Sequence, residues 1–384
     1  MKPRDLFDSQ KIREAFSARG VEVREEIIES LIKGLGELVS SEITRERNRM
    51  RIKKNDASKE HKPAHQSLTD AQIAGLPTWL QSVIGQSVVI GASEQVVQAP
   101  DGRKYHLANP LNHLSGAEWT FFLSSVISTR YPTSGPESYA HHIRKIHPSP
   151  KPPQLMRDII EFFTKEGELV LDYFMGVGGT LLGASLCGRR AVGIDLSHEY
   201  VEAYERASEE LLLVPQRTHC GDAMQVLSDQ SQMADLLGHD EVALVAIDPP
   251  YGDMMNRPKT GEAVKTGGDT SPTPFTGLAE DLGNLSIEEF YPRFTQSIKL
   301  VLPYLKRKGH IAVFIKDLQP TGSNTNLLHA RVIEDLNSID GLRYLGTKIW
   351  ADQSVNLYPY GYPYAFVSNQ IHQYIMFFRK EGRI

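Results

Sequence analysis

The sequence predicts an α/β protein whose second half folds into a doubly wound, mostly parallel sheet. From Glu168 onward, short apolar runs typical of buried strands alternate with amphipathic segments long enough for helices. A helix between two strands provides the crossover that makes those strands parallel. The chain has 384 residues, 40% hydrophobic and 23% charged, a globular composition at a length typical of two domains. Its two cysteines, Cys187 and Cys220, provide neither a disulfide framework nor the spacing of a metal site.

The elements of this half are expected in a regular order along the chain. The predicted strands are residues 167–174, 189–195, 216–222, 241–248 and 310–317. The predicted helices are residues 181–188, 198–213, 287–309 and 327–339. Two closing strands, at residues 342–350 and 372–380, lie so close in the sequence that they favour an antiparallel hairpin at the edge of the sheet.

Residues 1–105 are predicted to form a separate, mainly helical region. Residues 24–44 are apolar at helical spacing, and this helix packs either on the core or on a second subunit. Thr69 begins a short capped helix, and a hairpin turn is expected at residues 100–102. No segment approaches the ~18 consecutive apolar residues of a membrane span, and the first residues lack the apolar core of a signal peptide. We therefore expect a cytoplasmic protein that does not contact a membrane.

Basic residues concentrate in two stretches although the formal net charge is −5. Between Glu42 and Lys62, eight basic residues accompany four acidic ones. The second stretch, residues 130–151, contains Arg130, Arg144, Lys145, Lys151 and three histidines. Such stretches either contact the phosphates of nucleic acid or form solvated helix surfaces, and charge alone does not separate the two.

A glycine-rich turn, residues 172–180, follows the first predicted strand. Open α/β sheets bind ligands at the carboxyl ends of their strands, where glycines let the backbone approach a ligand closely. The spacing fits neither a dinucleotide pattern, since position 181 is leucine, nor a P-loop.

Three acidic residues, Asp172, Asp195 and Asp222, end successive predicted strands. Around the glycine turn their carboxylates suit a cationic group, the hydroxyls of a ribose and an adenine amino group. Together these describe a site for S-adenosylmethionine. The alternative interpretation is a structural turn with ordinary helix-capping aspartates.

The tetrapeptide Asp248-Pro249-Pro250-Tyr251 follows the most apolar predicted strand. The prolines fix φ and remove two N–H donors, so that the turn is rigid and presents backbone carbonyls. The Asp248 carboxylate and the Pro249 carbonyl are then two acceptors beside the aromatic ring of Tyr251. An amino group on a base ring is a poor nucleophile, and hydrogen bonds from its two N–H groups to such acceptors free its lone pair for attack on a methyl sulfonium. Tyr251 can stack on the ring.

These motifs resemble those of the DNA amino-methyltransferases, which make N6-methyladenine or N4-methylcytosine from S-adenosylmethionine. The residues that match the family's motifs are Asp172, Phe174, Gly176, Gly178, Asp195, Asp222 and the tetrapeptide 248–251. The resemblance extends from about Asn109 to the C-terminus, and none is identified for residues 1–105.

The resemblance implies the class I S-adenosylmethionine-dependent methyltransferase fold for residues 106–384, with S-adenosylmethionine as cofactor. It implies as cofactor-binding residues Lys151, Pro152, Asp172, Phe174, Gly176, Gly178, Thr180, Asp195 and Asp222. It implies as catalytic residues Asp248, Pro249, Pro250 and Tyr251. The resemblance also implies that the Lys151-Pro152 pair starts a helix that covers the methionine end of the cofactor.

The implied substrate is duplex DNA with its target base flipped out of the stack. Adenine is preferred over cytosine, because the adenine-specific members more often begin the tetrapeptide with Asp or Asn. Other expected partners are a restriction endonuclease, subunits of a defence system and a second copy of the chain. The same core serves N4 of cytosine, an RNA base or a protein glutamine amide, and a cofactor-binding protein without turnover is the non-enzymatic alternative.

Two further segments are expected near the substrate. Residues 252–285 have little periodicity, and we interpret them as a mobile loop that orders over the substrate rather than as a surface loop. The tyrosine-rich segment 358–364 contributes one or two tyrosines to the wall of the base pocket and the others to the core. Target recognition then falls to residues 1–150 with their basic stretches.

Overall fold

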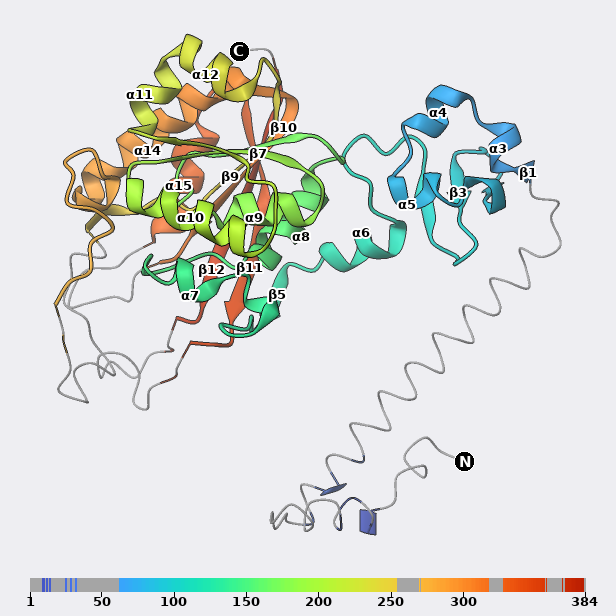
Figure 1. The fold of residues 1–384 in the computed structure, drawn as a ribbon, viewed down its shortest axis with the longest axis horizontal. Helices are drawn as coiled ribbons and strands as arrows, with labels where there is room; N and C mark the ends of the chain where they lie inside the picture. Colours follow the sequence, from blue (N-terminus) through green and yellow to red (C-terminus); the bar gives the residue numbers. More distant parts are fainter. Residues whose placement is uncertain are drawn as a thin grey trace. The chain divides into compact units, whose positions relative to one another are not determined.

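The computed structural model describes residues 62–253, 271–317, 327–355 and 370–382, with isolated positions elsewhere (Figure 1). The chain divides into two compact units, Met1–Pro63 and Ala64–Ile384. The helix predicted at residues 24–44 and the basic stretch at 42–62 lie almost entirely outside the described residues. The first unit contributes the two-residue strand β1 (Lys62–Pro63).

The second unit contains the other described elements. Its first part holds α3 (Ala64–Ser67), α4 (Asp70–Ala74), α5 (Thr78–Gln81), η2 (Ile84–Gln86), β2 (Val88–Ile90), β3 (Val96–Gln98), β4 (Lys104–His106), α6 (Gly116–Phe122), β5 (Val126–Thr129), η3 (Pro136–Ser138) and α7 (His141–Arg144). Its second part holds α8 (Pro153–Phe163), β6 (Leu169–Asp172), α9 (Gly179–Leu186), β7 (Arg190–Asp195), α10 (His198–Glu210), β8 (Arg217–Cys220), α11 (Ala223–Ser228), α12 (Gln230–Leu237), β9 (Val242–Ile247), η5 (Leu282–Asn284), α14 (Ile287–Val301), η6 (Leu302–Tyr304), β10 (Leu305–Ile315), α15 (Leu328–Asn337), β11 (Leu342–Asp352) and β12 (His372–Lys380).

The described strands of the second part, with β5, form an eight-stranded sheet in the order β5-β11-β12-β10-β9-β6-β7-β8. Neighbours from β10 to β8 pair in parallel. Strand β12 lies between β10 and β11 and is antiparallel to both. This topology is that of the class I methyltransferases, and the predicted fold class is confirmed.

The sheet differs from the prediction at two points. Strand β5, which no periodicity indicated, pairs in parallel with β11 and lies outside the C-terminal hairpin. The long helix predicted to end at residue 309 ends earlier, at Val301, and Leu305 already begins β10. Pro303 lies in the intervening turn and has no N–H to continue an α-helix.

Helices cover both faces of the sheet, so the central strands are buried on both sides (Figure 1). All six residues of β9 are buried. Leu244 and Ala246 belong to the apolar cluster that includes α8 and α9, whereas Val245 and Ile247 belong to the cluster that includes α14. This two-sided burial explains why the parallel strands read as continuous apolar runs.

Residues 64–107 contain more strand than the predicted mainly helical region. Strands β2, β3 and β4 form an antiparallel meander with its own small core. The predicted hairpin turn is present, because Gly102 N donates to Ala99 O at 2.9 Å between β3 and β4. The predicted cap is also present, since Thr69 and Gln72 form a capping box at α4.

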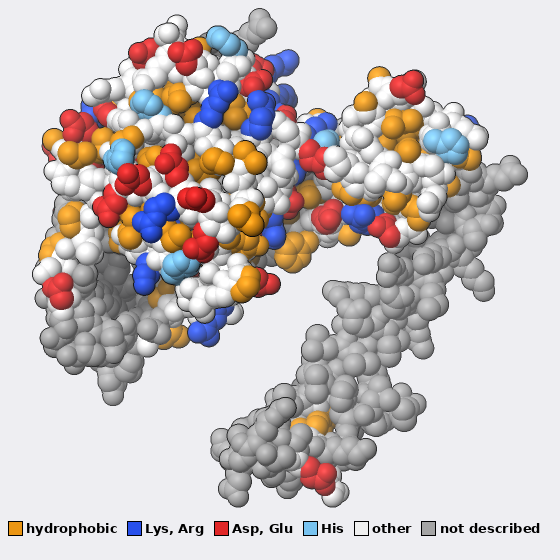
Figure 2. Space-filling view, in the orientation of Figure 1, with side chains coloured by type: hydrophobic (Ala, Val, Ile, Leu, Met, Phe, Trp, Pro, Cys, Tyr) orange, Lys and Arg blue, Asp and Glu red, His pale blue; other side chains and the backbone are white. Residues whose placement is uncertain are grey.

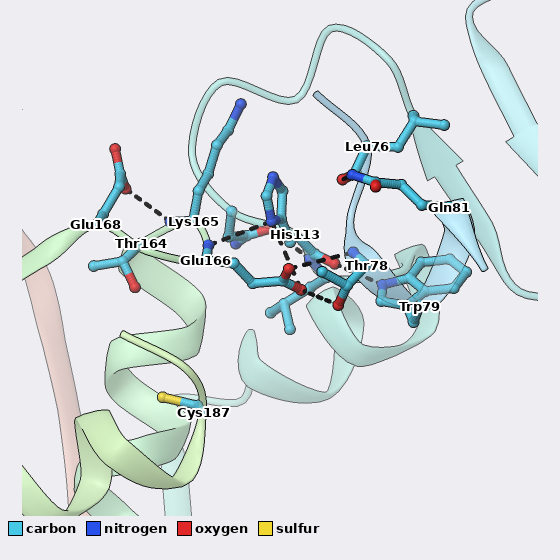
Figure 3. A network of polar contacts seen from close by, with 12 residues as sticks. Leu76, Thr78, Trp79, Gln81, His113, Thr164, Lys165, Glu166, Glu168 and Cys187 are labelled. Carbon is cyan, nitrogen blue, oxygen red and sulfur yellow. Dashed lines mark hydrogen bonds and ion pairs between the residues drawn. The ribbon is translucent and has the colours of Figure 1, made fainter. Parts of the chain in front are cut away.

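A polar network joins α5 to the loop before β6 (Figure 3). The hydroxyl of Thr78 donates to Glu166 Oε1 at 3.1 Å, and its backbone N–H donates to Oε2 at 3.3 Å. The indole of Trp79 donates to the carbonyl of His113 at 3.0 Å. His113 in turn accepts the backbone N–H of Glu166 at 3.3 Å.

Acidic and basic side chains are interspersed over the described part of the surface seen in Figure 2. Among the described residues, no helix is long and apolar enough to cross a bilayer. The described residues also contain no cluster of three or more metal-ligating side chains.

The packing of the glycine turn, residues 172–180, against Tyr204 can be tested by substitution. Gly178 has φ +74°, and a Cβ there would lie 2.1 Å from the buried ring of Tyr204. Gly188 has a similar φ of +68°, but nothing lies within 4 Å of a Cβ. Gly178→Ala should lower the free energy of unfolding by about 2–5 kcal/mol, because backbone strain and overpacking add.

The matched control Gly188→Ala carries only the backbone strain, about 1–2 kcal/mol. Urea unfolding of both variants measures the difference. Equal losses would contradict the packing of Gly178 on Tyr204.

Candidate active site

Acidic residues gather at one edge of the sheet, where the parallel strands end. Asp172 and Asp195 are the last residues of β6 and β7, and Asp222 and Asp248 follow β8 and β9. Parallel neighbouring strands bring their carboxyl ends together, so four distant segments meet there. The sequence predicted each of these positions.

Two cavities lie at this edge and share His147, Ser149, Phe174, Gly176 and Asp248. The first cavity also contains Asp195, Asp222, the tetrapeptide residues after Asp248, and residues of the 271–285 segment. The second also contains Lys151, Asp172 and Thr180. The two cavities therefore adjoin one another, and together they are called the cleft, with carboxylates along both.

Asp172 is only 4% exposed and is held by its own turn. Its Oδ1 accepts the backbone N–H of Phe174 at 3.1 Å, and its Oδ2 accepts the hydroxyl of Thr180. Burial raises the pKa of Asp172 to about 7, and the neighbouring Asp248 and Asp195 act in the same direction. Thr180, predicted to contact the cofactor, orients this carboxyl group and also lines the second cavity.

Asp195 and Asp222 are tied to the backbone around them. Asp195 accepts the N–H groups of Gly176, at 2.7 Å, and Ser197, at 2.8 Å. Burial raises the pKa of Asp195 to about 6. Asp222 caps α11 by accepting the N–H of Met224 at 3.0 Å. Asp222 therefore both caps a helix and lines the cleft, so the capping role is confirmed and is compatible with the predicted cofactor role.

Asp248 forms an ion pair with Lys151 through its Oδ2. Its Oδ1 is buried and has no hydrogen-bond partner among the described residues. Burial raises the pKa of Asp248, while the charge and hydrogen bond of Lys151 lower it. Lys151, predicted from the family to serve the cofactor, is thus in contact with the carboxylate predicted to be catalytic.

Tyr251 lines the cleft but is only 5% exposed. Its ring belongs to the apolar cluster of β9 and α14, and its hydroxyl group is hydrogen-bonded to the backbone of Lys316. Burial raises the pKa of Tyr251 well above its usual value. The ring of Tyr251 is therefore held in one position by its packing and by this hydrogen bond.

Not every predicted cofactor residue lies in the cleft. Gly176 and Phe174 line both cavities, whereas Gly178 packs against Tyr204 and Pro152 lines a neighbouring groove instead. Residue 178 must be glycine because the side chain of Tyr204 leaves no room for a Cβ. A sequence pattern does not distinguish a glycine required by packing from a glycine required by a ligand.

Sequence reasoning missed the aromatic cover of the cleft. The ring of His147 lies 4.8 Å from that of Tyr200 and 5.2 Å from that of Phe275, between centroids. The hydroxyl of Tyr200 donates to the carbonyl of Phe275 at 2.9 Å. Burial and the charge of Lys151 lower the pKa of His147 to about 3, so the imidazole is neutral. The sequence marked this histidine only as one of three in the basic stretch 130–151.

The segment that carries Phe275 is organised by the buried carboxylate of Asp281. This carboxylate accepts the N–H and the hydroxyl of Thr276 at 3.0 and 2.7 Å, and the N–H of Gly283 at 2.8 Å. Residues 271–285 are the described end of the predicted substrate loop, and here they line the cleft. No periodicity signalled Asp281.

The donor set fits S-adenosylmethionine. Carboxylates at both ends of an extended cleft suit a cationic ligand with ribose and amino groups. The aromatic rings of Phe174, Tyr200 and Phe275 along the first cavity suit an adenine. Asp195 and Asp222 would hold the adenosine part, and Asp172 lies in the cavity that the methionine part would take.

The family comparison agrees with this geometry. Residues 37–206 match the family described as DNA methylase, N6_N4_Mtase. The predicted resemblance to the DNA amino-methyltransferases is confirmed. The match begins at residue 37, within the region for which the sequence motifs identified no resemblance.

Individual relatives match shorter stretches of this amino-methyltransferase-like chain. A tRNA (guanine(10)-N2)-dimethyltransferase of Methanocaldococcus jannaschii is 29% identical over 175 residues, 44% of this chain and 48% of that protein. The type II methyltransferase M2.DpnII of Streptococcus pneumoniae is 43% identical over 63 residues, 16% of this chain and 24% of that one. M.HpaI of Haemophilus parainfluenzae is 38% identical over 73 residues, 19% and 23% of the two chains. The chain spans about half or less of the length of these relatives.

Solved structures are more distant. TrmN from Thermus thermophilus is 16% identical with a TM-score of 0.40, covering 65% of this chain and 54% of that chain. An rRNA methylase from Streptococcus thermophilus is 10% identical with a TM-score of 0.36, and the match covers 60% of this chain and 98% of that chain. The fold assignment rests on the strand order described above.

The buried carboxyl group of Asp172 predicts how stability changes with pH. Its pKa is higher in the folded protein than the ordinary 3.8, so the folded state favours the protonated form and loses stability as the pH rises from about 4 through 7. Asp172→Asn mimics the protonated group. It should raise the free energy of unfolding at pH 8 by about 2–4 kcal/mol, several degrees in Tm, and change little at pH 4.

Thermal unfolding of both proteins across this pH range measures the effect, with the low-pH values as the internal control. An asparagine variant that is less stable than the parent protein at pH 8 would contradict the conclusion that burial destabilises the ionised form of Asp172.

Proposed function

We propose that the protein transfers a methyl group from S-adenosylmethionine to the exocyclic amino group of a base in DNA, with N6 of adenine as the first target. The observation that carries the proposal is the tetrapeptide 248–251 at the end of β9, lining the same cleft as the carboxylates of Asp172, Asp195 and Asp222. The DNA methylase match and the type II relatives support DNA as the substrate. Adenine rests on the Asp that begins the tetrapeptide.

The bound cofactor supplies an electrophilic methyl group on a sulfonium. The protein's task is to present an amino group whose lone pair is conjugated with a base ring. In our proposal Oδ1 of Asp248, which has no partner among the described residues, accepts one N–H, and the carbonyl of Pro249 accepts the other. Both bonds favour a tetrahedral nitrogen with a free lone pair. The methylated nitrogen then releases one proton, for which the Asp248 carboxylate is an acceptor.

In our proposal, target recognition falls to residues 1–150, with the two basic stretches at residues 42–62 and 130–151. The family match covers residues 37–206 and so includes both basic stretches completely. Within the second, Arg144 is buried and structural, whereas Lys145 is exposed. Residues 106–384 form the catalytic domain in this proposal, with residues 271–285 over the substrate. Residues 254–268 of the predicted substrate loop lie outside the described residues. The tyrosine-rich segment 358–364 lies outside the described residues.

RNA is the second candidate substrate, and a specific observation favours it. The longest of the matches given above is to a tRNA (guanine(10)-N2)-dimethyltransferase, and a second archaeal enzyme of that name is 29% identical over 107 residues. An N2 amino group of guanine presents the same two N–H groups to Asp248 and Pro249. DNA remains first because the family match is to DNA methylases.

Mass spectrometry of nucleosides tests the proposal. The protein is incubated with S-adenosylmethionine and either unmethylated genomic DNA or unmodified RNA, and both are digested. We expect N6-methyladenine in DNA, and a rate about 10²–10³-fold lower for Asp248→Ala, as for the loss of one preorganised hydrogen-bond partner. The control is Asp240→Asn, which changes an exposed aspartate ahead of β9.

The alternatives give different products. N4-methylcytosine would keep the mechanism and change the base, and N2-methylguanosine would favour the RNA candidate. No methylated base in either nucleic acid, with cofactor binding demonstrated, would overturn the proposal.

A further inference from the structure

The carboxylate of Asp248 has two unlike oxygens. One, Oδ2, is paired with the ammonium group of Lys151. The other, Oδ1, is buried without a hydrogen-bond partner among the described residues. A buried carboxylate oxygen without a partner costs free energy unless a ligand supplies a donor. Oδ1 is therefore the oxygen available to a substrate, while Oδ2 is occupied by the ion pair with Lys151.

Among the described groups around Asp248, Lys151 is the one that favours the ionised form of its carboxyl group. Asp172 on β6 lies close enough for the charge of Asp248 to raise the pKa of the Asp172 carboxyl group. His147 in the shared wall is neutral, and the Tyr251 hydroxyl has its own partner in the backbone of Lys316. The Lys316 ammonium group is itself disfavoured by burial and by Lys151. Among the described residues, Lys151 provides the ion pair that offsets the desolvation of this carboxylate.

The backbone of Lys151 is fixed by its surroundings. Arg144, 1% exposed, donates from Nη1 to the carbonyl of Lys151 at 3.0 Å and from Nε to the carbonyl of Tyr139 at 3.0 Å. On the other side, a Cβ at residue 179 would lie 2.6 Å from the same Lys151 carbonyl, so glycine permits the approach of α9. The side chain is 9% exposed, with its ammonium 5.5 Å from the ring centroid of Phe314. Such support is typical of a preorganised group.

We propose that Lys151 is a positioning residue that keeps Asp248 ionised and turns its free oxygen toward the substrate amino group, rather than a ligand of the cofactor. This role rests on the proposed function, in which Asp248 accepts a hydrogen bond from the substrate. An ionised carboxylate only accepts hydrogen bonds, whereas a protonated carboxyl group uses one of its oxygens as a donor. An amino group needs acceptors. The ion pair thus selects a substrate that offers N–H donors, and Lys151 acts through Asp248.

The pH profile of kcat separates this role from a structural one. Lys151→Met should move the acidic limb to higher pH by at least about one unit, a roughly tenfold lower rate on that limb, with recovery toward alkaline pH. Lys151→Arg keeps the charge and should keep the profile. Lys299→Met, an exposed lysine on α14, is the matched control and should leave the profile unchanged. An unshifted profile in Lys151→Met would overturn the proposal.

Cofactor affinity gives a second readout. Calorimetry should show S-adenosylmethionine binding to Lys151→Met within about twofold of the parent protein. A tenfold or greater loss of affinity, together with an unshifted pH profile, would return Lys151 to the cofactor site that the family resemblance implies.

A double-mutant cycle tests the ion pair without any substrate. Lys151→Met leaves an unpaired carboxylate, Asp248→Asn leaves an unpaired ammonium, and the double variant removes both charges. At pH 8 the double variant should be more stable to urea than the sum of the single losses predicts. Additive losses would overturn the pairing. If the cycle shows a clear coupling but no nucleic acid is methylated, the ion pair is confirmed and the proposed function is refuted.

Discussion

The burial of carboxyl groups at one edge of a parallel sheet is the constraint on which the rest of this site depends. Four strands end there with acidic residues, and the cleft they line excludes much of the water that would stabilise their charges. Desolvation therefore raises the pKa of Asp172, Asp195 and Asp248 together. The protein offsets this cost with backbone N–H groups at the first two and with a lysine at the third.

This electrostatic arrangement gives each carboxylate a different task. Asp172 and Asp195 retain raised pKa values near neutrality, which suits a site that receives a cation. Asp248 is the one with an ammonium partner, and it lies at the turn whose prolines expose carbonyls. The carboxyl groups suited to a cation thus lie beside a turn that presents hydrogen-bond acceptors, and the proposed methyl transfer to an amino group requires this combination.

Much of the fold followed from the sequence because its signals are local. Apolar runs such as residues 242–247 and the glycine turn predicted the parallel strands of the sheet, and the acidic residues at strand ends predicted the edge where the cleft lies. Strand β5 could not be predicted, since its four residues are half-exposed and are held by pairing with a strand more than 200 residues away. The Lys151–Asp248 pair was missed for the same reason: it joins side chains from distant segments, and a motif reports residue type but not the contact.

The most direct test of the cationic cleft is the proton balance of cofactor binding. Calorimetric titration of S-adenosylmethionine in two buffers of different ionisation enthalpy gives the number of protons released. If a cation enters beside carboxyl groups whose pKa values are about 7 and about 6, binding should release roughly half a proton at pH 7 and more at pH 6. Binding with no release, or with less release at pH 6 than at pH 7, would contradict the account.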